Sequence, residues 1–191
     1  LKKQGLENRL VTIASPVFDL PHFQLMPVAQ IFSFNLFVGQ LAGGDSIQPF
    51  ATVTDYENWL KRVGGYLTWL ETARANMAVG KSRGVVWPKV IVRRTTDQFD
   101  DILTDDLATH LYYRPILQMP ASFPAADRAR LTAAYKAIIE TQVNPAHRRF
   151  RDFLANEYLP AAGDHTGIGS LPGGPEAYRY LVRYHTSADM T

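Results

Sequence analysis

The residues best suited to chemistry lie in a glycine-rich segment near the end of the chain. It reads Gly167-Ile168-Gly169-Ser170-Leu171-Pro172-Gly173-Gly174-Pro175. Glycines just before a helix leave backbone N–H groups free to approach an anion or a peptide carbonyl. A tight turn that lets the next helix pack closely explains the same residues equally well. On the first interpretation, Gly173 and Gly174 are candidate substrate-binding residues.

Phenol, guanidinium and imidazole groups crowd the helix that is predicted to follow these glycines. Each such group needs a polar partner when it is buried, and a bound substrate is one partner that could serve. Hydrogen bonds within the protein are the commoner solution. The candidate substrate-binding side chains in this segment are Tyr178, Arg183, Tyr184 and His185.

Other reactive patterns are incomplete in this sequence. A helical zinc hydrolase needs two histidines four residues apart with a glutamate between them, and none of the five histidines has such a partner. Ser170 has Ile168 where a nucleophile elbow needs glycine. The acidic run from Asp97 to Asp106 lacks the glycine and spaced glutamate of a calcium loop, which favours a solvated helix end. We therefore assign no metal ligand and no catalytic residue.

Composition and charge narrow the possible partners. The 191 residues are 46% hydrophobic with a net charge of +2, which gives no field that would favour nucleic acid or an anionic membrane. Acidic residues follow the basic segment from His147 to Arg151, so we interpret it as a solvated face. The absence of cysteine excludes disulfides, thiolate catalysis and cysteine-ligated metals. No apolar stretch reaches the roughly 18 residues of a membrane helix, so we expect no transmembrane segment.

The elements that must position these residues are helices, because helical spacing of apolar residues recurs and strict alternation is rare. We therefore predict an all-α fold. After Thr54, a predicted N-cap with Glu57 three residues on, apolar residues follow a 3.6-residue period as far as Met77. Gly64 and Gly65 interrupt this helix, and each costs ~1 kcal/mol relative to alanine. We expect a break or a close helix crossing there.

Three further helices complete the predicted scaffold. Trp87-Pro88 starts one whose charged outer face needs compensation by a neighbouring element, and residues 104–123 form a packed, irregular connection. The longest helix begins near Pro124, and Asn144-Pro145 should kink it. The last helix starts at Pro175 and has so little ordinary solvent-facing surface that we expect it to be surrounded on most sides.

Several segments from Phe23 onward resemble the bacterial domain of unknown function 885. They are DYENWLKRV from Asp55, GVVWPKV from Gly84, FLANEYLPAA from Phe153 and, most specifically, GIGSLPGG from Gly167 followed by YRYLVRYHT from Tyr178. The resemblance implies a helical, zinc-metallopeptidase-like protein that is exported, periplasmic or lipid-anchored to a bacterial membrane. It also implies a zinc-binding segment of the type His-Glu-Gly-x-Pro-Gly-His-His. That segment is absent from this sequence. In the family it lies downstream of the motif that ends here in His185-Thr186.

These features predict a single partial domain over residues 1–191, part of a larger helical domain whose catalytic zinc helix is missing. We expect it to form the scaffold and substrate cleft of a zinc-dependent peptidase or hydrolase, with a peptide substrate in the parent protein. By itself the chain should hold no zinc, show no activity and tend to self-associate through exposed apolar surface. The alternative is a non-catalytic helical protein-binding module that uses the aromatic last helix as its interface.

Overall fold

The computed structural model describes residues 6, 10, 22–31 and 33–186, and within these residues the chain is helical with no strand. The predicted all-α fold is confirmed. The α-helices are α2 (His22–Leu25), α3 (Phe34–Ala42), α4 (Val53–Ser82), α5 (Lys89–Ile102), α6 (Arg114–Leu117), α7 (Ala125–Ile138), α8 (Asn144–Asp152) and α9 (Gly174–Thr186). Short 3-10 or π-helical segments join them: η2 (Leu111–Tyr113), η3 (Ile139–Val143), η4 (Phe153–Tyr158), η5 (Leu159–Ala161) and η6 (Ile168–Ser170).

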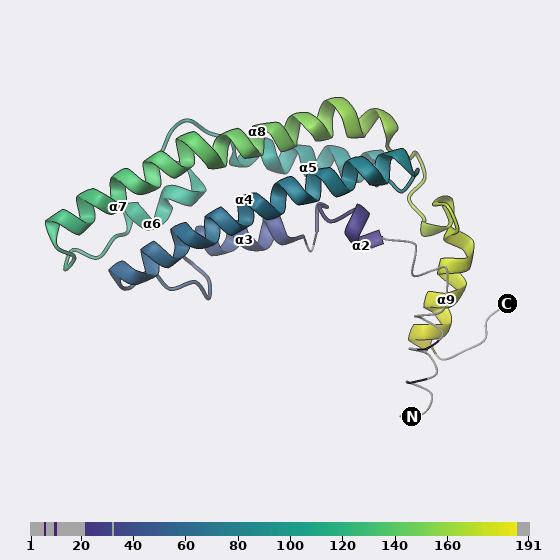
Figure 1. The fold of residues 1–191 in the computed structure, drawn as a ribbon, viewed down its shortest axis with the longest axis horizontal. Helices are drawn as coiled ribbons and strands as arrows, with labels where there is room; N and C mark the ends of the chain where they lie inside the picture. Colours follow the sequence, from purple (N-terminus) through teal and green to yellow (C-terminus); the bar gives the residue numbers. More distant parts are fainter. Residues whose placement is uncertain (1–5, 7–9, 11–21, 32, 187–191) are drawn as a thin grey trace.

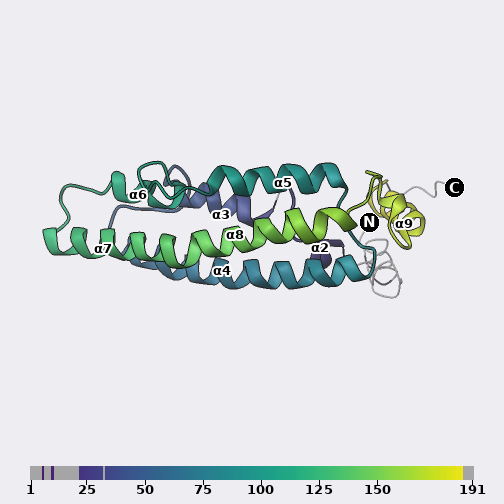
Figure 2. The same ribbon diagram turned by 90° about the horizontal axis from the view of Figure 1, so that it is seen from above.

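Long helical rods form an elongated body, with α9 at one end (Figures 1 and 2). α4 lies beside the continuous run from α7 through α8 to η4, and α5 packs on α8 and η4. α2 and α3 pack on α4, whereas α9 packs against η6. Aromatic side chains dominate the core between the rods. Its largest fully buried members include Trp59, Tyr56, Tyr135, Tyr158, Phe99 and Phe150.

α4 begins two residues earlier than the sequence suggested. Its N-cap is Thr52, where the backbone is still extended, with φ −125° and ψ 156°. Thr52 Oγ1 accepts from the Asp55 amide at 3.2 Å, and Asp55 Oδ2 accepts from the Thr52 amide at 2.8 Å. This reciprocal pair is a capping box. The predicted cap at Thr54 with Glu57 was therefore wrong, because residues 53 and 54 already lie in the helix.

α4 also passes through Gly64 and Gly65 without the predicted break. Val63, Tyr66 and Leu70 are fully buried along its inner face and hold this stretch against the core. Burial of such side chains outweighs the ~1 kcal/mol that each glycine costs in a helix. A Cβ added at either glycine would meet nothing within 4 Å. The described residues therefore provide no close crossing there either.

α5 and the connection after it match the sequence analysis. Pro88 is the N-cap of α5, and Val92, Thr95 and Phe99 are its buried residues. On the outer face, Arg151 Nε of α8 lies 3.4 Å from Asp100 Oδ1, so a neighbouring element compensates the charge of Asp100. The connection over residues 104–123 is packed, because its short helices η2 and α6 bury Tyr112 and Pro115.

The rod from α7 to η5 contains two π-helical segments, η3 and η4, and the first of them lies where a kink was predicted. η3 ends immediately before Asn144-Pro145, and α8 resumes with the proline in its first turn. A wider turn accommodates the missing amide and the ring of a proline without ending the helix. The rod finishes at η5, which contains Pro160.

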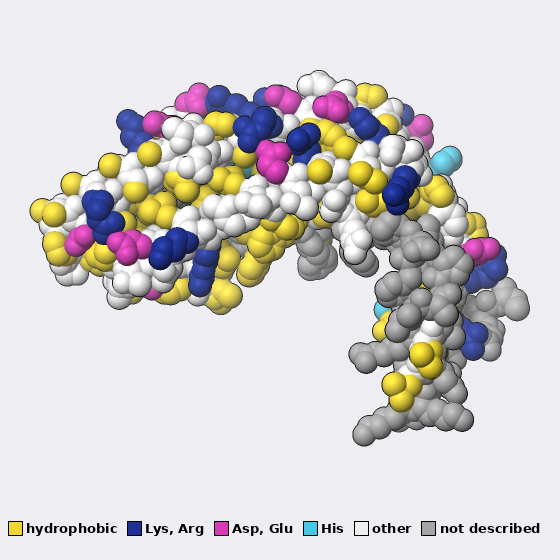
Figure 3. Space-filling view, viewed as in Figure 1, with side chains coloured by type: hydrophobic (Ala, Val, Ile, Leu, Met, Phe, Trp, Pro, Cys, Tyr) yellow, Lys and Arg dark blue, Asp and Glu magenta, His cyan; other side chains and the backbone are white. Residues whose placement is uncertain are grey.

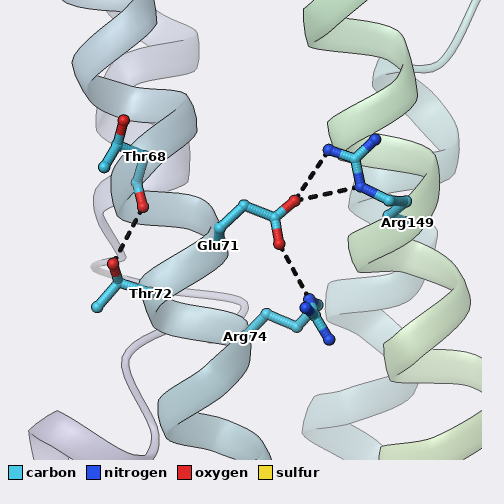
Figure 4. Close-up of polar contacts among 5 residues, drawn as sticks. All are labelled: Thr68, Glu71, Thr72, Arg74 and Arg149. Carbon is cyan, nitrogen blue, oxygen red and sulfur yellow. Dashed lines mark hydrogen bonds and ion pairs between the residues drawn. The ribbon is translucent and has the colours of Figure 1, made fainter.

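Ion pairs fasten α4 to α8 (Figure 4). Arg149 donates to Glu71 Oε1 from Nη2 and Nε at 2.9 and 3.2 Å, and Arg74 Nε donates to Glu71 Oε2 at 3.1 Å. These side chains are partly exposed, so the network stabilises by about 1 kcal/mol at most. Thr68 and Thr72 lie on a different side of α4, and each hydroxyl donates to a carbonyl one turn back.

Candidate functional site

The glycine-rich segment forms a compact turn that carries α9. Gly173 has φ +68°, a left-handed conformation that favours glycine. The Gly174 amide donates to the Leu171 carbonyl at 2.8 Å, so this N–H is engaged within the loop. A Cβ at Gly174 would lie 1.9 Å from the Ile168 carbonyl oxygen, so the helix approaches η6 more closely than any other residue would allow. Gly174 therefore fits the second interpretation, in which a tight turn lets the next helix pack closely.

The side chains of α9 are more exposed than predicted. Only Gly174 and Ala177 are buried in this helix, whereas Tyr178 is 58% and Tyr184 46% exposed. The described residues therefore do not surround α9 on most sides. The Tyr184 ring stacks on Tyr180, with centroids 6.0 Å apart, and meets His185 edge-on at 5.1 Å.

The candidate site residues do not converge on one point. Gly173 and Gly174 open α9, while Arg183, Tyr184 and His185 lie near its far end. At about 1.5 Å of rise per residue, this separates the two groups by roughly 16 Å. A ligand touching all of them would have to lie along the helix.

A hollow of about 260 Å³ lies beside the first half of the glycine-rich motif. Its walls are mostly apolar and come from three stretches that are distant in the sequence. The lining residues are Met26, Val86, Trp87, Pro88, His165, Thr166, Gly167, Ile168, Ser170 and Leu171. The motif that the sequence singled out therefore contributes to a pocket, although with different members from those we named.

Trp87 is held in this wall by its backbone. Its amide donates to the Tyr158 hydroxyl at 3.0 Å, and its carbonyl accepts from the Gly163 amide at 3.3 Å. A second bond runs from the Lys89 amide to the Gly163 carbonyl at 2.8 Å, and Lys89 Nζ pairs with Asp164 at 2.8 Å. The buried indole Nε1 of Trp87 has no hydrogen-bond partner in the described part of the chain. Sequence reasoning missed Trp87 as a pocket residue, although the Gly84–Val90 motif contained it.

A second polar cluster lies inside the core. His147 Nε2 is 2.9 Å from the Tyr66 hydroxyl, and the Tyr112 phenol is also hydrogen-bonded to Tyr66. Burial is the main cause that lowers the pKa of His147 to about 3, and the nearby His110 adds to it, so the ring is neutral. Burial raises the pKa of Tyr66 above its usual value. His147 is 0% exposed, so this cluster has no access to a substrate.

His110 belongs to the same region and has a defined tautomer. Its Nδ1 accepts from the Tyr112 amide at 3.2 Å, so the proton is on Nε2, which donates to Asn144 Oδ1 at 3.0 Å. The side-chain Nδ2 of Asn144 in turn donates to the Thr104 carbonyl at 2.9 Å. Burial lowers the pKa of His110, so it too is neutral.

These residues do not fit a zinc ion. No group of three or more His, Cys, Asp or Glu residues in the described ranges could hold a metal. His110 and His147 are buried and bonded to protein partners. In the acidic run, Asp105 pairs with Arg148 at 2.6 Å and Asp100 with Arg151. We therefore derive no step through zinc from this chain.

Comparison with known proteins gives the chain a family and a fold. A family model described as "Bacterial protein of unknown function (DUF885)" matches residues 2–191. The chain belongs to this family. The DUF885 chain is also similar to the crystal structure of "the putative lipoprotein from Colwellia psychrerythraea", with a TM-score of 0.75 and 15% identity. The match covers 88% of this chain and 29% of that chain.

At this identity the likeness shows the fold alone, and the DUF885 chain spans less than one third of the neighbour's length. No curated protein matches it. Among the described helices of this family member, none is both long enough and apolar enough to cross a membrane.

Proposed function

We propose that this chain supplies the helical framework and one wall of the substrate cleft in a zinc-dependent, peptidase-like hydrolase. It has no hydrolytic activity of its own. The observation that carries this proposal is the apolar hollow beside Gly167–Leu171, because concave apolar sites with a few polar groups are where ligands bind. Export or lipid anchoring remains part of the proposal, by analogy with the lipoprotein that shares the fold.

The size of the hollow indicates the ligand. Pockets for whole small molecules usually measure about 300–1,000 Å³. At about 260 Å³, this hollow suits one large apolar side chain of a peptide. Gly167 lines the hollow, is exposed and has no side chain, so a peptide backbone can approach it closely.

The test measures binding of two probes to the 191-residue chain. N-acetyl-phenylalaninamide should bind and N-acetyl-glycinamide should not, with tryptophan fluorescence as the readout because Trp87 lines the hollow. Ile168→Asp should weaken binding at least tenfold by placing a charge in the wall. Ile47→Asp, at a side chain 82% exposed and outside the hollow, is the matched control and should bind normally.

Activity assays complete the test. Purified chain should contain no stoichiometric zinc and should hydrolyse no peptide. Equal affinity for the two probes would show that the hollow does not recognise an apolar side chain, which would contradict its role as a substrate site. Tight zinc with peptidase activity would overturn the assignment of catalysis to residues outside this chain.

The alternative function, a non-catalytic helical binding module, is favoured by the exposed rings of Tyr178 and Tyr184 on α9. Aromatic residues are enriched where proteins bind one another. Tyr178→Ala and Tyr184→Ala would weaken capture of a partner protein in that case. Under the cleft proposal, neither change affects binding of the phenylalanine probe.

A further inference from the structure

One side of the bundle lacks charged side chains over a long distance. Residues 22–44 contain no Asp, Glu, Lys or Arg. On α3, the side chains of Phe34 and Phe37 are exposed, as is Ile31 just before the helix. A shallow groove of about 670 Å³ runs between Gln30 and Gln40 beside them. Contiguous apolar surface of this kind marks a site of protein contact.

The uncharged surface continues onto α4. The Phe34 ring packs edge-on against Trp69 of α4, with centroids 4.9 Å apart. Beyond it, exposed small or uncharged residues recur every three or four positions: Gly65, Thr68, Thr72, Ala75, Val79 and Ser82. The Thr68 and Thr72 hydroxyls are already bonded to their own helix, which leaves their methyl groups to face outward. We call these residues, with Ile31, Phe34 and Phe37, the α3–α4 face.

The charged residues in the middle of α4 are directed away from this face. Glu71 and Arg74 are the only charged residues between Val63 and Gly80, and both are engaged toward α8 (Figure 4). The space-filling view shows the same contrast. White and yellow surface runs along the middle of α4, whereas blue and magenta side chains gather at the two ends of this helix and along the edge formed by α8 (Figure 3).

The two glycines in α4 have no explanation within the described chain. Glycine is less favourable than alanine in a helix interior, and a Cβ at Gly64 or Gly65 would meet nothing within 4 Å. By contrast, contacts within the described chain require glycine at position 80 of the same helix, because a Cβ added there would lie 2.7 Å from the Val85 carbonyl oxygen. Small residues at three- and four-residue spacing allow another helix to approach closely.

We propose that the α3–α4 face is permanently covered by a further helical segment of the same polypeptide, whose own uncharged face crosses α4 at Gly64 and Gly65. The Colwellia structure supports this occupant, because 88% of the present chain matches only 29% of that longer chain. Permanent interfaces are also more apolar than transient ones. The covering role is independent of what binds in the pocket beside Gly167.

The first test compares Gly65→Ala in the whole product of the gene and in the 191-residue chain. In the 191-residue chain it should raise the thermal midpoint by about 2–4 °C, since alanine favours the helix and nothing is displaced. In the whole product it should lower the midpoint, because the covering helix then meets a methyl group. Gly80→Ala is the control and should lower both. A rise in both proteins would overturn the proposal.

The second test uses the absence of cysteine from residues 1–191, with any cysteine elsewhere in the whole product first replaced by serine. Single substitutions Thr72→Cys on the face and Arg94→Cys on the exposed side of α5 are labelled with a thiol reagent. In the whole product the thiol at position 72 should react at least tenfold more slowly than that at 94, and in the 191-residue chain the rates should be similar. Equal rates in both proteins would show that nothing covers the face. Slow reaction in the 191-residue chain, with a dimer mass by light scattering, would assign the face to a second copy instead.

Discussion

His147 lies at the centre of the core, with its Nε2 beside the Tyr66 hydroxyl and no partner for Nδ1 among the described residues. Its pKa is about 3 in the folded protein and about 6.5 when exposed. Because the folded-state pKa is lowered, neutral His147 contributes its full share to the free energy of unfolding above pH 6.5. This contribution is lost progressively as the pH falls toward 3. The free energy of unfolding should therefore decrease by about 1.4 kcal/mol per pH unit in this window.

Urea denaturation at pH 7, 6, 5 and 4 measures this dependence. His147→Phe removes the titrating ring, so its stability should fall less steeply with acid than that of the unaltered protein, whatever its stability at pH 7. Thr54→Ala, at an exposed residue without a titrating group, should keep the original slope. Identical slopes for all three proteins would contradict the buried, neutral state of His147.

Gly174 gives a second prediction for a single residue. Gly174→Ala should displace α9 from η6, because the new Cβ would lie 1.9 Å from the Ile168 carbonyl oxygen. Hydrogen exchange of the amides in residues 168–186 should speed up. Gly169→Ala is the matched change in the same loop, where a Cβ meets nothing within 4 Å, and exchange should stay unchanged. Equal exchange in both variants would mean that the close approach is not required.

Among the elements, α4 offers a direct test of where it begins. Thr52→Ala removes the side chain that accepts from the Asp55 amide, which should cost about 1 kcal/mol of stability. Thr54→Ala removes an exposed hydroxyl inside the helix and should cost little. Chemical denaturation of the two variants compares them. A larger loss of stability for Thr54→Ala than for Thr52→Ala would indicate that Thr54 is the N-cap, as the sequence suggested.

The sequence predicted helices well and their ends less well, for identifiable reasons. Thr52 with Asp55 and Thr54 with Glu57 are similar capping patterns, and the extended backbone at Thr52 decides between them. The glycines at 64 and 65 looked like a break because a local rule cannot weigh the burial of Val63 and Tyr66 beside them. Asn144-Pro145 was recognised as a disturbance, but the π turn before it depends on packing along the whole rod.

The candidate site was predicted only in part. The glycine-rich motif does border the hollow, but Trp87 and Met26 come from distant segments that no spacing rule connects to it. The side chains of α9 were expected to be enclosed because tyrosine and arginine alternate around the helix. In the described chain most of them remain open to solvent, so their role stays a prediction.

For the molecule as a whole, α9 should unfold more readily than the bundle. It buries only Gly174 and Ala177 and packs against η6, whereas α4 and α8 pack against each other within the main core. Local stability follows buried apolar contact. In native-state hydrogen exchange, amides of α9 should exchange at least tenfold faster than those around Tyr66 and Phe150. Equal protection would indicate that α9 unfolds together with the bundle.

The buried polar cluster fixes how the rods align along their axes. Apolar faces alone would tolerate a shift of α8 by one helical turn, since one apolar contact can replace another. Such a slip would separate His147 from Tyr66 and Asn144 from His110, and each stranded polar group would cost about 1–3 kcal/mol. The hydrogen bonds of the two histidines therefore favour one axial register of α8 over other registers that apolar packing alone would allow.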